Sequence, residues 1–96
     1  MLDESRAVEK TDHDILFGRG SLTNKHPGNL YYRQKAVELL PSYILSSKEE
    51  KQDITNLLIE SIKGEGRCFL EKGKDNLWHE VIDGVFHKAS QTFRDI

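Results

Sequence analysis

The chain has 96 residues, 36% of them hydrophobic, and a formal net charge of -2 at pH 7, which is enough apolar material for one modest core and therefore one domain. Its single cysteine excludes an internal disulfide and a zinc site made of several thiolates. No apolar run approaches the roughly 20 residues of a membrane-spanning helix, and the polar first residues indicate no secretory signal peptide, so we expect an intracellular protein.

Residues 1–11 have no periodic pattern and alternate in charge, which predicts a flexible N-terminal lead. A single globular domain is expected over residues 12–96. The sequence HDILF at residues 13–17 predicts a short edge strand with Ile15 and Phe17 on one face. This strand would lead directly into a loop of unusual composition.

That loop and the start of the next helix form the stretch Phe17–Arg33, which contains three glycines, a proline and two asparagines among its residues. Gly18 and Gly20 flank Arg19, so the backbone can adopt a positive φ there while the guanidinium projects freely. Asn29 is expected to cap a helix that starts at Leu30, with its N–H groups directed at the loop. The stretch predicts an anion site, and a purely structural turn with a capped helix is an equally weighted alternative.

The first helix is predicted over residues 29–40, with Pro41 ending it because proline removes a backbone donor. Its inward stripe is expected to contain Leu30, Ala36, Val37 and Leu40. A second helix begins after Ser46 or Ser47 and ends at Gly64 or Gly66. Its apolar stripe consists of Ile54, Leu57, Leu58 and Ile62.

Two short apolar runs, residues 67–72 and 77–81, surround the turn sequence GKDN and predict a β-hairpin whose tip projects like a wing. A closing helix is expected over residues 85–94, with Val85, Ala89, Thr92 and Phe93 facing inward. The predicted fold class is therefore α+β: two helices, a hairpin and a closing helix, with a short N-terminal strand. By analogy it is winged-helix-like.

Catalytic chemistry is poorly represented. The four histidines, His13, His26, His79 and His87, lack metal-ligand spacing, and Cys68 has no motif around it. The glycines around Arg19 precede no Lys-Ser or Lys-Thr pair, so they do not form a P-loop. We therefore expect no catalytic residues, no metal and no cofactor.

Recognition of phosphates is better supported. Gly18–Lys35 contains four arginine and lysine residues and no acid, although the whole chain is slightly acidic. The candidate anion- or nucleic-acid-binding residues are Arg19, Lys25, His26, Asn29, Arg33, Lys35, Lys72 and Lys74. Gly18, Gly20, Pro27 and Gly28 are expected to shape the loop.

The residues also follow a recognisable pattern, D-x-L-x-G-R-G-x-x-T-N-x-H-P-G-N, from Asp14 to Asn29, followed by Arg33. Arg67, Phe69, Leu70, Trp78, Glu80 and Val81 continue it in the hairpin. In these features residues 12–95 resemble a domain of unknown function that recurs in diatom and related algal proteins. The resemblance implies no activity, but it implies a module inside larger regulators or scaffolds. Cys68 departs from the pattern, and the closing helix is less basic than the resemblance predicts.

Two functions follow from these observations. The first is a non-enzymatic nucleic-acid-binding module, most simply for duplex DNA, in a nuclear or transcriptional regulator. The second is a protein-interaction domain that receives an acidic or phosphorylated peptide, which suits the negative net charge. Neither involves a membrane.

Overall fold

The computed structural model describes residues 7–18 and 20–96. Arg19, one of the predicted phosphate-binding residues, lies outside the described residues. The α+β fold class is confirmed. In chain order the described elements are β1 (Ala7–Val8), β2 (Ile15–Leu16), α1 (Ser21–Asn24), α2 (Pro27–Leu45), α3 (Lys48–Gly64), β3 (Phe69–Lys72), β4 (Trp78–Glu80) and α4 (Val85–Asp95).

The strands form one mixed sheet in the order β1-β4-β3-β2. β3 and β4 are the predicted antiparallel hairpin, and β2 is the predicted edge strand, which pairs in parallel with β3. β1 pairs with β4 through Ala7 opposite His79 and Val8 opposite Trp78. Residues 7 and 8, for which we expected no regular structure, therefore belong to the sheet.

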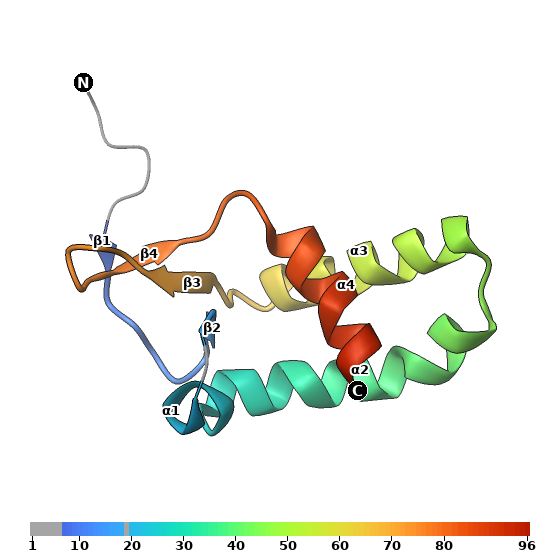
Figure 1. Ribbon diagram of the computed structural model, residues 1–96, viewed down its shortest axis with the longest axis horizontal. Coiled ribbons are helices and arrows are strands. Elements are labelled where there is room, and N and C mark those ends of the chain that lie inside the picture. The colour runs from blue at the N-terminus through green and yellow to red at the C-terminus, as the bar shows by residue number, and fades with distance from the viewer. Residues whose placement is uncertain (1–6, 19) are drawn as a thin grey trace.

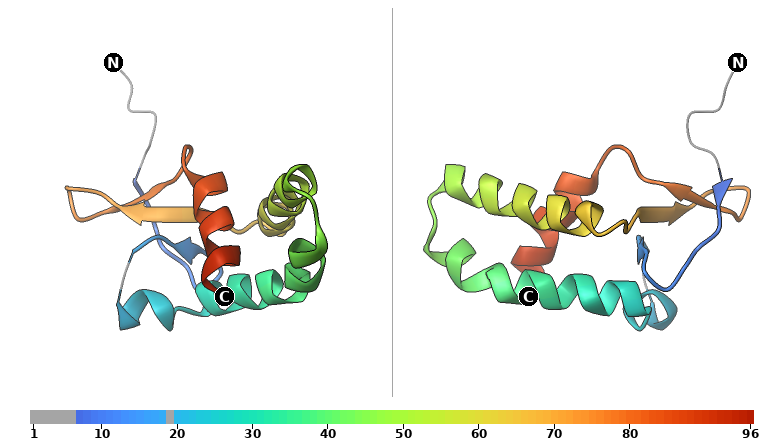
Figure 2. Two further views of the ribbon diagram at one scale, coloured as in Figure 1. Left: turned by 45° about the vertical axis from the view of Figure 1, so that its right-hand side comes forward. Right: turned by 180° about the vertical axis from the view of Figure 1, so that it is seen from behind.

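The helices lie beside this sheet rather than in a stack above it. Figure 1 shows α2 and α3 as two long antiparallel arms with α4 crossing between them, and the sheet at one end. Figure 2 shows from two other sides that the sheet lies away from the loop that joins α2 to α3. Ile15 of β2, Phe69 of β3 and Val81, the residue after β4, belong to the main core, where they meet residues of all three long helices.

The predicted boundaries of the first helix are wrong at both ends. α2 begins at Pro27, with His26 as its N-cap residue, and it continues through Pro41 to Leu45. Proline inside a helix costs about 3 kcal/mol. Contacts of the last turn oppose this cost, because the ring of Tyr43 stacks on Phe93 with centroids 4.3 Å apart. Tertiary packing therefore overrides the local stop signal.

The predicted inward face of this helix is confirmed at Ala36 and Leu40 but wrong at Leu30 and Val37. Leu30 and Val37 are 50% and 47% exposed, whereas Tyr32 and Ala36 are buried. Asn29 is buried as well, and positions 29, 32 and 36 share one helical face. The helix is rotated so that Asn29 faces β2, which turns Leu30 and Val37 outward.

The other predicted elements are confirmed. Ser47 caps α3 through a capping box with Glu50, and Leu58 and Ile62 are buried on its inner face, although Leu57 is 50% exposed. Thr55 and Ile59 occupy the core positions beside them. α4 buries Val85, Ala89 and Phe93 as predicted.

Candidate anion-binding site

The start of α2 is fixed to β2 by polar groups. The amide of Asn29 brackets Leu16: its Oδ1 accepts a hydrogen bond from the Leu16 N–H at 2.7 Å, and its Nδ2 donates to the Leu16 carbonyl at 2.8 Å. Because β2 is an edge strand, these two bonds replace the partners that a further strand would supply. Asn29 therefore acts as a surrogate strand partner, and the prediction that it caps the helix is wrong.

Asp14 and Gly28 also hold the start of α2 close to β2. The Asp14 carboxylate accepts hydrogen bonds from the N–H and the hydroxyl of Thr11, both at 2.9 Å, and from the N–H of Cys68 at 3.2 Å. Gly28 lies so close to the Asp14 carbonyl that a Cβ atom on Gly28 would be 1.9 Å from that oxygen. Only glycine fits at this approach.

His26 also has a structural contact. It is buried, and its Nε2 lies 3.0 Å from the carbonyl oxygen of Thr11. We call Asp14, Leu16, His26, Gly28 and Asn29 the β2–α2 joint. Two of the predicted binding residues, His26 and Asn29, are thus engaged inside it, whereas Pro27 occupies the first turn of α2.

Lys35 is directed away from the loop. Its Nζ lies 3.8 Å from a carboxylate oxygen of Glu65 and 5.6 Å from the centroid of the Tyr31 ring. The hydrogen bond with Tyr31 and the nearby Glu65 carboxylate raise the pKa of Lys35. Arg67 stacks on the same ring at 3.8 Å. Lys35 is therefore part of a cluster with its own counter-charge.

Arg33 has a different neighbour. It projects from α2 towards Lys88 of α4, and both residues line a concavity of about 230 Å³ together with Thr92, Asp95 and Ile96. We call this the Arg33–Lys88 cleft. Among the described residues, neither cation forms an ion pair. The Asp95 carboxylate, which accepts a hydrogen bond from Gln91 at 3.0 Å, leaves two positive charges and one negative charge in the lining.

Lys88 also connects the cleft to the glycine loop. Its Nζ lies 4.7 Å from the centroid of the Phe17 ring. On this side it lines a second concavity, of about 270 Å³, together with Phe17, Gly18 and residues of α4. Burial, and then the charge of Arg33, lower the pKa of Lys88. Gly18 and Gly20 have φ angles of 144° and 100°, which residues other than glycine rarely adopt.

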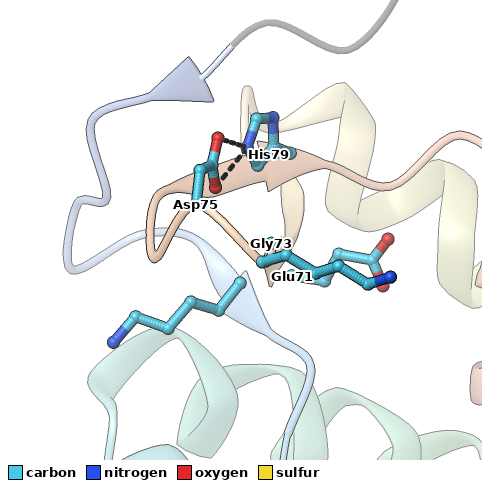
Figure 3. Close-up of a pocket in the computed structure, with 6 residues that line it drawn as sticks. Glu71, Gly73, Asp75 and His79 are labelled. Carbon is cyan, nitrogen blue, oxygen red and sulfur yellow. Dashed lines mark hydrogen bonds and ion pairs between the residues drawn. The ribbon is translucent and has the colours of Figure 1, made fainter.

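The hairpin tip carries a separate group of cations. Lys72 and Lys10 lie 5.7 and 5.8 Å from the centroid of Trp78, and Lys74 is exposed. Figure 3 shows the Asp75 carboxylate directed at the ring of His79, with a shortest distance of 2.9 Å. The hollow at this tip, about 540 Å³, is lined by Glu71, Lys72, Gly73, Lys74, Asp75 and His79. Its charges are mixed.

The structure thus divides the predicted binding residues. It brings Arg33 beside Lys88 of α4, gives Lys35, His26 and Asn29 other partners, and leaves Lys25 exposed between α1 and α2. Lys72 and Lys74 lie apart on the hairpin. Sequence reasoning missed Lys88. The apolar pattern of α4 places this residue outside the core, but it does not indicate that Phe17 and Gly18 lie beside it.

The described part of the chain gives little support to a metal site, a reactive cysteine or a membrane-spanning helix. It contains no cluster of three or more histidine, cysteine or acidic residues that could hold a metal ion. Cys68 is half-buried, and burial raises the pKa of its thiol. No helix among the described residues has the length and apolar character needed to cross a membrane.

Residues 14–95 match a family described as a domain of unknown function, DUF6824. The chain belongs to this family. Comparison with curated proteins and with solved structures yields no match. Any function of this DUF6824 domain must therefore be argued from the side chains that its fold brings together. Of the predicted binding residues that the structure describes, Arg33 is one that lines a concavity with a second cation and forms no ion pair.

Proposed function

We propose that this chain is a non-enzymatic nucleic-acid-binding module that contacts backbone phosphates through the Arg33–Lys88 cleft. The observation that carries the proposal is the meeting of Arg33 and Lys88, from two different helices, without an ion-pair partner among the described residues. Two like charges held together in a concavity repel one another, and a phosphate oxygen between them removes that cost.

The two side chains suit this role in different ways. The planar guanidinium of Arg33 can donate two parallel hydrogen bonds to a phosphate, and its charge persists at any accessible pH. The half-buried ammonium of Lys88 is partly stripped of water, which lowers its pKa. An incoming anion raises that pKa again, so the protonated form of Lys88 is favoured in the complex.

The hairpin supplies the second contact. Its tip extends past the helices at the same end of the molecule as α1 (Figure 1), and it carries Lys72 and Lys74. The winged-helix analogy adds the expectation that this tip touches the nucleic acid next to the loop. The resemblance to a domain of diatom and related algal proteins supports a place within a larger regulator or scaffold.

The test is fluorescence anisotropy of labelled random-sequence DNA duplexes, measured over a series of salt concentrations. The Arg33→Met/Lys88→Met variant is compared with wild type and with Lys35→Met, a control whose cation already pairs with Glu65. Each phosphate contact contributes about 0.9 to the slope of log affinity against log salt. The double variant should therefore lose about 1.8 from the slope, while Lys35→Met changes it little.

Two results would contradict the proposal. Flat anisotropy at low salt and high protein concentration would exclude general duplex binding. An equal loss in Lys35→Met and in the double variant would show that binding follows overall charge and not the cleft. The single tryptophan, Trp78, gives an independent signal, because a contact at the hairpin should quench its fluorescence.

A specific observation favours a second candidate. The Arg33–Lys88 cleft holds about 230 Å³ and includes the Asp95 carboxylate, which suits one phosphate group better than a continuous polyanion. In that case the domain binds a phosphorylated or acidic peptide. Duplexes would then give no response, whereas a phosphopeptide would bind wild type and lose affinity for the Arg33→Met/Lys88→Met variant.

A further inference from the structure

A further concavity lined by cations lies on another side of α4, between α4 and α3. It measures about 220 Å³ and is lined by Tyr43, Lys48, Lys51, Gln52, Thr55, Phe86, Ser90 and Arg94. We call it the α3–α4 pocket. Three of these residues are cations and none is an acid. It shares no residue with the Arg33–Lys88 cleft.

The two helices build this pocket from regularly spaced positions. On α3, Lys48, Lys51 and Thr55 lie three and four residues apart and therefore share one face. On α4, Phe86, Ser90 and Arg94 recur every four residues and do the same. Lys88, which lines the Arg33–Lys88 cleft, lies about 120° around the helix from Arg94, which lines the α3–α4 pocket. The helix α4 therefore presents its cations on two different faces.

Tyr43 closes the pocket from the last turn of α2. This turn exists only because α2 continues through Pro41. One side of the Tyr43 ring stacks on Phe93, with an interplanar angle of 10°, and Lys51 Nζ lies 5.4 Å from the ring centroid. Phe86 contributes a second ring that is 40% exposed. The pocket thus combines aromatic surface with positive charge.

The positive charge is not neutralised by nearby acids. Within the described residues, Lys48, Lys51 and Arg94 form no ion pair. The acids of the first turns of α3 are outside the lining: Glu50 accepts a hydrogen bond from the Ser47 N–H at 2.9 Å, and Glu49 and Asp53 are exposed. The N-terminus of α3, beside Lys48, adds further positive potential.

From this arrangement we infer that the α3–α4 pocket binds a small phosphate monoester that also contains an aromatic ring, as a nucleoside monophosphate does. Three cations and the hydroxyl of Ser90 match the charge and the acceptor oxygens of a phosphate. Phe86 offers the ring a stacking surface.

The inference goes beyond the proposed function, because it concerns a different side of α4 and a small ligand. The same chemistry has two sources: a free nucleotide, or the 5′-phosphorylated end of a nucleic-acid strand. AMP tests the first source. Short oligonucleotides with a 5′-phosphate or a 5′-hydroxyl test the second.

The experiment is a titration of ¹⁵N-labelled full chain followed by amide chemical shifts. Adding AMP should shift residues of the pocket, including Gln52, Thr55 and Ser90, and should leave Arg33 and its surroundings unchanged. Adenosine and inorganic phosphate, which each lack one half of the ligand, should bind at least about tenfold more weakly than AMP, since each forfeits charged hydrogen bonds or ring contact.

Variants complete the test. Lys51→Met/Arg94→Met should weaken AMP binding at least about tenfold, whereas Lys63→Met, the same change at the far end of α3, should alter it less than about twofold. Arg94→Met alone is a milder substitution at an exposed position if the double variant unfolds. The inference would be overturned if the amide signals of the pocket residues did not shift either with millimolar AMP or with the 5′-phosphorylated strand. Shifts centred on Lys88, or an equal loss in Lys63→Met, would also overturn it.

Discussion

The β2–α2 joint and the Arg33–Lys88 cleft both use residues of α2, but their polar groups differ in how they are satisfied. In the joint, Asn29 and Asp14 are buried and each makes two or more hydrogen bonds. In the cleft, Arg33 and Lys88 have no ion-pair partner among the described residues. The start of α2 therefore contains two kinds of polar residue: Asn29 fixes the helix to β2, whereas Arg33 is left available to a ligand.

The difference has an energetic meaning. Satisfied buried groups stabilise the fold, and removing one leaves its partner unpaired at a cost of about 1–3 kcal/mol. The half-buried ammonium of Lys88 loses hydration in the free protein, and its contact with the Phe17 ring offsets only part of that cost. Substitutions in the two regions should therefore separate: those in the joint lower stability, and those in the cleft lower binding while stability is kept.

The largest effect is expected for Gly28→Ala. The added Cβ would lie 1.9 Å from the Asp14 carbonyl oxygen, and because both are backbone groups, β2 and α2 must separate. We expect a loss of at least about 3 kcal/mol in the free energy of unfolding, measured by urea denaturation. The control is Gly64→Ala, whose Cβ meets nothing within 4 Å and which should be neutral or slightly stabilising. Equal stability of the two variants would contradict the account of the joint.

A smaller loss is expected for Asn29→Asp. The carboxylate cannot donate to the Leu16 carbonyl, which loses its 2.8 Å partner, and it introduces a charge at a buried position. About 2–3 kcal/mol of stability should be lost. Asn56→Asp makes the same change on the exposed face of α3 and should stay within about 0.5 kcal/mol of wild type. A similarly small effect at Asn29 would mean that the bracket around Leu16 is dispensable.

The next effect depends on pH. Burial raises the pKa of Tyr32 to about 12 from the ordinary value of 10.0, so the folded state holds this proton more tightly than the unfolded state does. The protonated Tyr32 hydroxyl therefore contributes to the free energy of unfolding in full below pH 10, and this contribution is lost as the pH rises from 10 towards 12. Tyr32→Phe should cost about 1 kcal/mol at neutral pH through its lost bond to Thr92, and its stability should fall less steeply above pH 10.

Thr92→Val is the matched control for this experiment. It removes the same 2.9 Å contact with the Tyr32 hydroxyl but keeps the phenol, so the steep alkaline loss should remain. Denaturation curves at several pH values between 9 and 11.5 distinguish the two variants. An unchanged alkaline limb in Tyr32→Phe would show that another group is responsible.

Much of this fold was predictable because its signals are local. The capping box at Ser47, the turn between β3 and β4 and the spacing of Val85, Ala89 and Phe93 each specify their own element. The extent of α2 was not predictable. Pro41 is a valid stop signal, and the contacts that favour continuation of the helix are tertiary, as in the stack of Tyr43 on Phe93, 50 positions further along the chain.

The candidate site was predictable only in part, for a related reason. The sequence indicated an anion-binding stretch, and Arg33 does face a concavity with a second cation. Which cations are free depends on tertiary neighbours: Glu65 occupies Lys35, and α4 brings Lys88 to Phe17. Likewise, nothing in the local pattern around Asn29 distinguishes a helix cap from a side chain that brackets an edge strand.

The most direct test of the division between joint and cleft is Lys88→Met, studied by thermal unfolding and duplex anisotropy on the same samples. Methionine keeps the length of the side chain against Phe17 and removes a charge whose burial is unfavourable. We predict a melting temperature equal to or above that of wild type, together with weaker binding and a shallower salt dependence. A lower melting temperature with unchanged binding would show that Lys88 supports the fold, and would contradict the central claim.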